Sequence, residues 1–197
     1  MNLNLAQLLA MARDTVRAPR EGAAAIMRMG FAPAVGWLAL LLMAVASTLL
    51  THISFAIMPP TVQDFWSTAM TSPVRTAILQ WVVLLVSVHA IHKVGRLRGG
   101  TGSLDQAVIL VAWLQFILLC VQIAQLFTQM FVPPLADILG LLGLVLFFWL
   151  LTNFVAELHG FKSLALTFIA ILITVFTAAI LLVLVFALLF GAAPPGV

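Results

Sequence analysis

Three histidines and a glutamate are the residues whose types and spacing suggest chemistry. His89 and His92 lie three residues apart, so a helix places both on one face. Glu157 and His159 follow a later apolar stretch. Zinc accepts imidazole and carboxylate ligands, so one hypothesis is a divalent metal site built from these four side chains. Because two histidines without a fuller motif are a weak signal, we otherwise expect no cofactor.

The same side chains allow two other roles. Glu157 would neutralise Lys93 or a histidine and pin two helices together, and this is the interpretation that we favour. Alternatively, a histidine would act as a proton-dependent switch, because imidazole titrates near neutral pH. The sequence contains no Gly-x-Ser-x-Gly and no His-Glu-x-x-His motif, so we do not expect an enzyme.

Uncharged polar side chains also recur inside the apolar stretches. They are Gln80, Gln115, Gln122, Gln125, Gln129 and Asn153. The four glutamines between positions 115 and 129 fall within a sector of about 80° on a helix. Such a stripe would line a polar cavity, which is the hypothesis of a small transporter or channel. We favour interhelical hydrogen bonds worth about 1 kcal/mol each, because no charged residue lies at mid-depth.

These residues must be positioned by helices in a membrane. Of the 197 residues, 64 % are apolar and only 8 % are charged, whereas a soluble domain carries about a quarter charged residues. Such a chain cannot cover its exterior with polar groups, so lipid must be its solvent. Cys120 is the only cysteine, which excludes an intramolecular disulfide and a tetrathiolate metal site.

Five apolar stretches are long enough, alone or with flanking residues, to cross a hydrocarbon core of about 30 Å. We predict an all-α bundle with spans at residues 34–57, 76–91 with flanking residues, 107–132, 138–155 and 164–190. Ser103 and Gln106 predict a capping box at the start of the third span. The glycines ahead of it, at positions 95, 99, 100 and 102, predict a flexible basic loop.

The basic residues give this bundle an orientation. Eight of the nine Lys and Arg residues lie on one side of the five predicted spans, and Arg75 alone lies on the other. The positive-inside rule then places the N-terminus in the cytoplasm and the C-terminus outside, in an inner (plasma) membrane. Because the charges sit beside span ends, the expected partners are the bilayer and anionic lipid head groups, and not nucleic acid. The predicted cytoplasmic interaction surface comprises Arg13, Arg17, Lys93, Arg96, Arg98 and Lys162.

Two further patterns concern packing. Residues 1–30 are predicted to form an amphipathic segment that either lies on the cytoplasmic membrane surface or packs against the bundle, and residues 31–197 form the five-helix domain. Ala18-Pro19 interrupts that amphipathic helix. In the last span, small residues at positions 170, 174 and 178 permit close helix approach within the bundle or across a dimer.

Three stretches together resemble the Yip family of membrane proteins, named for interaction with Ypt/Rab GTPases. They are Val-Arg-Ala-Pro-Arg-Glu at 16–21, His-Lys-Val-Gly-Arg through Gly-Gly-Thr-Gly-Ser at 92–103, and Trp-Leu-Leu-Thr-Asn-Phe through Glu-Leu-His-Gly-Phe to Ser at 149–163. The resemblance covers roughly residues 15–190 and implies five helices with a cytoplasmic N-terminus. In eukaryotic relatives it implies vesicle trafficking, with GTPases and other Yip-type proteins as partners.

The short region ahead of the first span is similar to a compact prokaryotic member of that family, and no catalytic residue is carried over. We therefore expect a non-enzymatic membrane scaffold or adaptor that acts through its cytoplasmic face and through helix or lipid contacts. Its expected partner is a second copy or another membrane protein. The alternatives are the glutamine-lined transporter and, more weakly, a metal-binding membrane protein or enzyme at the His/Glu cluster.

Overall fold

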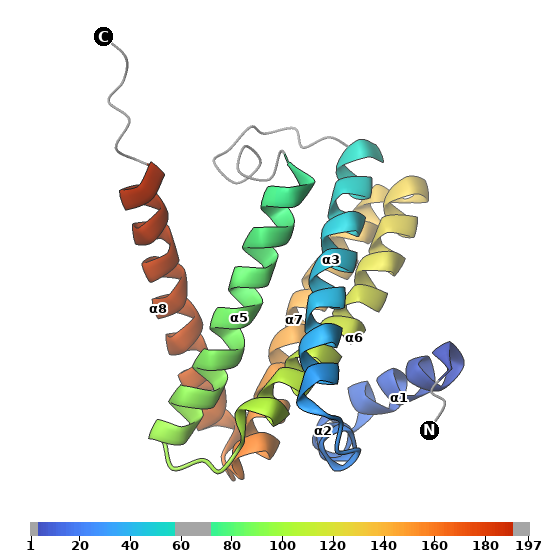
Figure 1. The fold of residues 1–197 in the computed structure, drawn as a ribbon. Coiled ribbons are helices and arrows are strands. Elements are labelled where there is room, and N and C mark those ends of the chain that lie inside the picture. The colour runs from blue at the N-terminus through green and yellow to red at the C-terminus, as the bar shows by residue number, and fades with distance from the viewer. Residues whose placement is uncertain (1–3, 58–71, 191–197) are drawn as a thin grey trace.

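The computed structural model describes residues 4–57 and 72–190, which contain seven α-helices and no strand. Five of these helices are long and apolar enough to cross a membrane, which confirms the predicted five-span, all-α fold. They are α3 (Pro33–Ile57), α5 (Pro73–Leu97), α6 (Leu104–Phe131), α7 (Pro133–His159) and α8 (Leu164–Phe190). The N-terminal helices α1 (Leu5–Arg17) and α2 (Pro19–Arg28) lie across one end of this bundle (Figure 1).

Local sequence signals set the helix boundaries. α5 and α7 each begin at a proline, whose missing N–H would have no partner in the first helical turn. At the start of α6, the Gln106 backbone N–H donates to the Ser103 hydroxyl at 3.2 Å, and the Ser103 backbone N–H donates to Gln106 Oε1 at 3.0 Å. The predicted capping box is therefore confirmed. Gly160, with φ 71°, ends α7 in the left-handed conformation that glycine adopts without strain.

Two membrane-spanning helices are longer than the sequence predicted, and the second helix of the N-terminal segment was not predicted. α5 and α7 extend beyond the apolar stretches at 76–91 and 138–155, because a helix continues to satisfy its backbone after it leaves the hydrocarbon. The N-terminal segment forms two helices instead of one. The backbone breaks at Ala18, and Pro19 opens α2 as its first residue.

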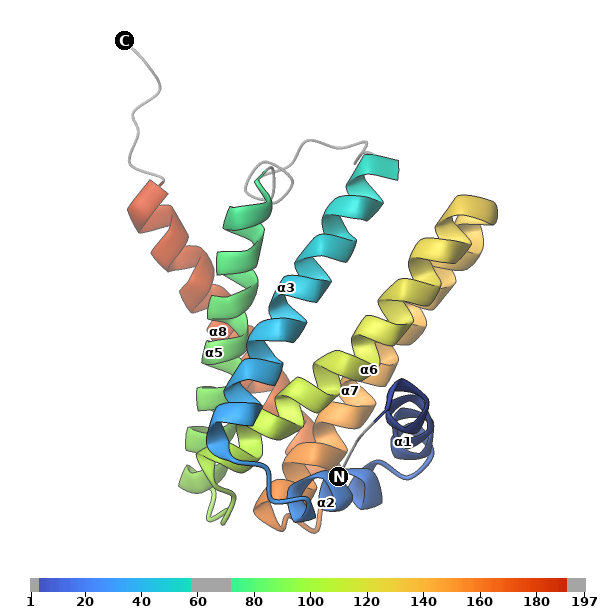
Figure 2. The same ribbon diagram turned by 45° about the vertical axis from the view of Figure 1, so that its right-hand side comes forward.

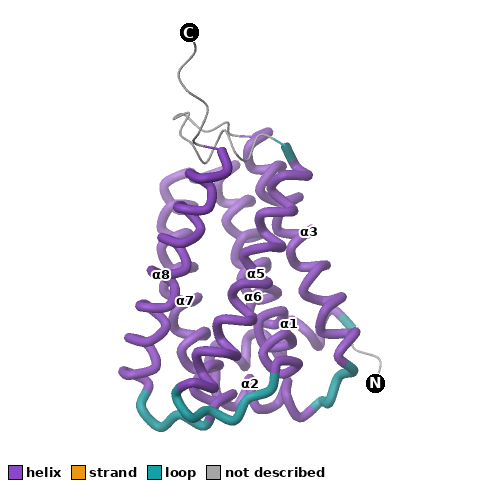
Figure 3. The backbone as a smooth tube through the Cα atoms, turned by 60° about the vertical axis from the view of Figure 1, so that its left-hand side comes forward, coloured by secondary structure: helices purple, strands orange, loops and turns teal. Residues whose placement is uncertain are grey.

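The core lies at the end of the bundle that α1 and α2 cover. There α6 and α7 bury a run of side chains, including Leu114 and Leu150, against Leu40 of α3 and Leu84 of α5. Toward the other end, apolar side chains such as Phe131 and Leu141 are exposed, as expected for a surface in contact with lipid. α8 leans away from α5 in that direction (Figures 1 and 2), whereas the α5–α6 and α7–α8 loops lie together at the core end (Figure 3).

Candidate functional site

His159 is the most buried of the predicted site residues, with 3 % of its surface exposed, at the point where α7 ends. The Gly102 backbone N–H donates to its Nδ1 at 3.3 Å, and Nε2 lies 3.1 Å from the Ile91 carbonyl oxygen. Since Nδ1 accepts a hydrogen bond, the proton belongs on Nε2, which donates to Ile91. The ring stacks on Phe161 with centroids 5.4 Å apart. His159 thus links three segments as a neutral imidazole.

Two glycines make room for that imidazole, and a third makes room for the neighbouring Leu158. A Cβ added to Gly95 or Gly100 would overlap the His159 ring, and one added to Gly102 would lie 2.5 Å from Leu158 Cγ. All three glycines are buried. They therefore serve a close approach of α5 and the following loop to the end of α7.

The N-terminal helices are attached to the same turn. The Arg20 guanidinium donates from Nη2 to the Phe161 carbonyl oxygen at 2.6 Å. We call the assembly of Arg20, Gly95, Gly100, Gly102, His159 and Phe161 the His159 junction. It joins α2, α5, the α5–α6 loop and α7 at one end of the bundle.

Only part of the amphipathic helix α1 packs against the bundle. Trp113 of α6 donates from Nε1 to the Thr15 hydroxyl at 3.2 Å, and Thr15 and Ala12 are buried. At the other end of α1, Leu5 and Leu9 are 65 % and 46 % exposed. The bundle-packing alternative therefore holds for the C-terminal half of α1. The exposed leucines of the N-terminal half are suited to the membrane interface.

Exposed basic side chains lie at the same end of the bundle as the His159 junction (Figure 1). All six residues of the predicted interaction surface are exposed, and they lie on α1, at the end of α5 and in the turn before α8: Arg13, Arg17, Lys93, Arg96, Arg98 and Lys162. In the described part of the chain, the only salt bridge joins Arg13 to Asp14 at 3.1 Å. The other five cations carry positive charge that no described carboxylate neutralises. We call these six residues the basic surface.

The structure does not bring the four side chains of the metal hypothesis together. Within residues 4–57 and 72–190, no three His, Cys, Asp or Glu side chains form a group that could hold a metal ion. His89 is exposed, with Nδ1 2.8 Å from the Leu85 carbonyl oxygen of its own helix. Both nitrogens of His159 already have backbone partners, while His92 is only half-buried.

The favoured pin between Glu157 and Lys93 or a histidine is wrong. Glu157 is half-buried and forms no salt bridge with any described residue. His159, two residues later, joins α5 to α7 through backbone hydrogen bonds instead. A neutral ring that finds a donor and an acceptor avoids the desolvation penalty that a buried charge pair incurs.

The polar stripe of α6 divides between two environments. Gln122 accepts from the Ser47 hydroxyl at 3.0 Å and donates to the Thr51 hydroxyl at 3.1 Å, while Gln129 accepts from the Ser54 hydroxyl at 2.8 Å. These hydrogen bonds join α6 to α3, which is the packing role that the sequence favoured.

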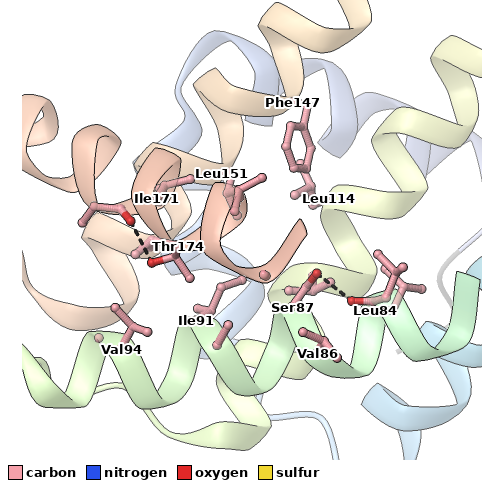
Figure 4. Close-up of a pocket in the computed structure, with 18 of the residues that line it drawn as sticks. Leu84, Val86, Ser87, Ile91, Val94, Leu114, Phe147, Leu151, Ile171 and Thr174 are labelled. Atoms are coloured by element: carbon pink, nitrogen blue, oxygen red, sulfur yellow. Dashed lines mark hydrogen bonds between the residues drawn. The ribbon is translucent and has the colours of Figure 1, made fainter. Parts of the chain in front are cut away.

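The remaining polar residues have other surroundings. Gln125 lies against Gly140 of α7, and buried Asn153 donates to the Trp149 carbonyl oxygen of its own helix at 2.8 Å. Gln80 and Gln115 line a cavity of about 180 Å³ between α5, α6, α7 and α8 (Figure 4). The glutamines therefore do not line one common channel.

Sequence reasoning missed Thr15, Arg20 and Trp113 as contacts of the N-terminal helices. One signal was available for the first of them, since Thr15 is a polar residue next to the apolar stripe of α1. The spacing of glycines at 95, 100 and 102 opposite a His-Gly turn was a second signal, but the sequence does not show which segments face each other.

Comparison with known proteins gives one family match. The family model described as the Yip1 domain matches residues 13–188, which include the three stretches that carry the resemblance and every residue of the His159 junction. No curated protein matches the chain, and no solved structure does.

Proposed function

Because this chain belongs to the Yip1 domain family and is a multi-pass membrane protein, we propose that it is a non-enzymatic scaffold or adaptor that binds its partner through the basic surface. The observation that carries the proposal is the group of exposed cations, five of them unneutralised by any described carboxylate, at the end of the bundle that holds the buried junction (Figure 1). By the positive-inside rule, this surface faces the cytoplasm from an inner membrane.

The His159 junction supports this role because it holds the cations in a fixed pattern. Arg96 and Arg98 lie between Gly95 and Gly100, which both pack on His159, and Lys162 directly follows Phe161. The Gly100 backbone N–H donates to the Gly95 carbonyl oxygen at 2.9 Å, which closes the end of α5 beneath these arginines. A partner would therefore meet charges whose backbone positions are already set, at a lower entropic cost of binding.

The chemistry of the basic surface indicates a partner with an acidic face, either a membrane protein or a protein at the membrane surface. A single exposed ion pair contributes about 0–1 kcal/mol, so recognition needs several of them at once. This is consistent with six cations spread over three segments of one end of the bundle.

The test is capture of partners from native membranes after chemical crosslinking. A Lys93→Gln/Arg96→Gln double variant removes two exposed cations of the basic surface, whereas Arg75→Gln removes an exposed cation at the opposite end of α5. We expect one reproducible protein partner with the wild type and with Arg75→Gln. The double variant should recover about tenfold less of it, because two ion pairs contribute about 1.4 kcal/mol.

Thermal unfolding of the purified variants checks that all of them fold. The proposal fails if captures contain lipid alone, or if the double variant recovers as much partner as Arg75→Gln. The transporter alternative has weaker support, because the cavity beside Gln80 and Gln115 is lined mainly by aliphatic side chains.

A further inference from the structure

The cavity between α5, α6, α7 and α8 is a crevice that is open along one side. Its floor is formed by Leu114 of α6 and Leu151 of α7, and its walls include Ile91 of α5 and Ile171 of α8 (Figure 4). The small residues of α8, Ala170, Thr174 and Ala178, line the crevice. Their short side chains leave space between α8 and the other helices. The sequence assigned those small residues to close helix contacts, whereas in the structure they border an open space.

The hydroxyl groups in the crevice are already satisfied. Ser87 donates to the Val83 carbonyl oxygen at 2.7 Å, and Thr174 donates to the Ala170 carbonyl oxygen at 2.7 Å (Figure 4). Such bonds within one helix leave the methyl and methylene groups as the surface that an occupant meets. The crevice therefore favours an apolar occupant over a polar solute.

The length of the α8 wall matches one leaflet of a bilayer. At 1.5 Å per residue, Thr167 to Ala178 on α8 spans about 17 Å, and one leaflet contributes about 15 Å of the hydrocarbon core. The α5 wall is longer, about 27 Å from Gln80 to Arg98, so it continues past the depth of one leaflet.

A positive charge stands at the mouth of the crevice. Arg98 lines it at the end nearest the His159 junction and is exposed. Its guanidinium makes one long hydrogen bond, 3.5 Å from Nη1 to the Leu166 carbonyl oxygen, and no salt bridge with a described residue. An apolar slot below an unneutralised arginine is complementary to an anionic phospholipid, whose negative head group stands above its hydrocarbon chains.

We propose that this crevice binds one acyl chain of an anionic phospholipid, with Arg98 holding the head-group phosphate. A helix of a second copy, about 10 Å across with its side chains, would occupy roughly 1,300 Å³ over a length of about 17 Å, far more than the crevice volume of about 180 Å³. An acyl chain is narrower and enters from the bilayer along the open side.

The test uses the purified full chain in liposomes, with no other protein present. The probe is phosphatidylglycerol with a diazirine in one acyl chain, and phosphatidylcholine with the same chain is the zwitterionic control. After irradiation, mass spectrometry locates the adducts. We expect phosphatidylglycerol adducts on crevice residues of α5 and α8, about fivefold above those of phosphatidylcholine, since one arginine near the surface contributes about that factor.

Two pairs of variants separate the head group from the chain. Arg98→Gln should reduce the phosphatidylglycerol adducts to the phosphatidylcholine level, while Arg96→Gln, which is exposed but does not line the crevice, should leave them unchanged. Thr174→Leu should remove crevice adducts of both lipids, whereas Ile173→Phe, on the exposed face of α8, should not.

The proposal is overturned if adducts spread evenly over the exposed faces of the spans, or if Arg98→Gln and Arg96→Gln behave alike. It is also overturned if the crevice residues of α5 and α8 give no adducts with either lipid. None of these outcomes depends on a protein partner, so failure here leaves the scaffold proposal untouched.

Discussion

Gly95→Ala is the substitution that most directly tests the His159 junction. Gly95 lies inside α5 with an ordinary helical backbone, so alanine causes no strain of its own. Its Cβ would overlap the His159 ring, and a buried ring packed by backbone on several sides has little room to shift. The ring must leave its site. It would then lose its hydrogen bonds to Gly102 and Ile91 and its stacking on Phe161.

These losses give the expected magnitude. Two hydrogen bonds contribute about 1 kcal/mol each, and one ring stack contributes about 1 kcal/mol. Replacing glycine by alanine inside a helix returns about 1 kcal/mol through higher helix propensity. The free energy of unfolding should therefore fall by about 2 kcal/mol.

The assay is equilibrium unfolding of the purified protein in mixed micelles, followed by tryptophan fluorescence. Gly143→Ala is the matched control, because Gly143 lies within α7 and a Cβ there would make an ordinary contact, 3.4 Å from Val121. Gly143→Ala should keep or slightly raise the stability. In a Gly95→Ala/His159→Ala double variant the clash is gone, so the double variant should lose less stability than the sum of the two single variants. Equal stabilities of Gly95→Ala and Gly143→Ala, or strict additivity, would refute the role assigned to His159.

Three further predictions concern packing and orientation. Gln122→Leu removes the hydrogen bonds to α3 and should lower the free energy of unfolding by about 1 kcal/mol, whereas Gln115→Leu on the crevice wall should change it by less than about 0.5 kcal/mol. Trp113→Phe removes the indole donor to α1 and should speed amide exchange in the C-terminal half of that helix about fivefold, as hydrogen-exchange mass spectrometry would measure. In a cysteine-free background, Asn4→Cys should react with an impermeant maleimide only from the cytoplasmic side and Arg75→Cys only from the opposite side; reaction of both from one side contradicts the predicted orientation.

The spans were predictable because the bilayer imposes a requirement that a sequence cannot satisfy by accident. About twenty apolar residues in a row are needed for each crossing, and prolines and capping residues mark where a helix begins. The capping box at Ser103 follows from local spacing alone and needs no knowledge of tertiary contacts. By contrast, the ends of α5 and α7 lie outside the apolar stretches, so both helices were predicted too short even though Pro73 and Pro133 mark where they begin.

The His159 junction was not predictable because its meaning depends on which residues face each other. Gly95 and His159 are 64 positions apart, and glycine at either end of a loop is equally consistent with a turn or with a close approach. Sequence reasoning chose Glu157 and not His159 as the residue that joins the helices, because a carboxylate attracts a nearby cation even when the exact positions of both are unknown. Burial reverses that order, since His159 finds backbone partners without carrying a charge.

The glutamine stripe failed as a single site for a geometric reason. A sector of one helix faces one neighbour only if the neighbour runs parallel to it over the whole stretch. The 14 residue steps from Gln115 to Gln129 extend about 21 Å along α6, which runs alongside α7 but diverges from α5 (Figure 2). One end of the stripe therefore reaches the crevice, while Gln122 and Gln129 meet α3.

The junction and the crevice share residues, and this connects the two proposals. Gly95 and Phe161 pack on His159 and also border the crevice, and Arg98 belongs both to the crevice and to the basic surface. A phosphate held by Arg98 would neutralise one cation of that surface. Lipid bound in the crevice would then weaken the attraction of an acidic partner without moving any helix, because Coulomb interactions between neighbouring surface charges act over about 8 Å at physiological salt. The occupancy of the crevice would in this way set the charge that the scaffold presents.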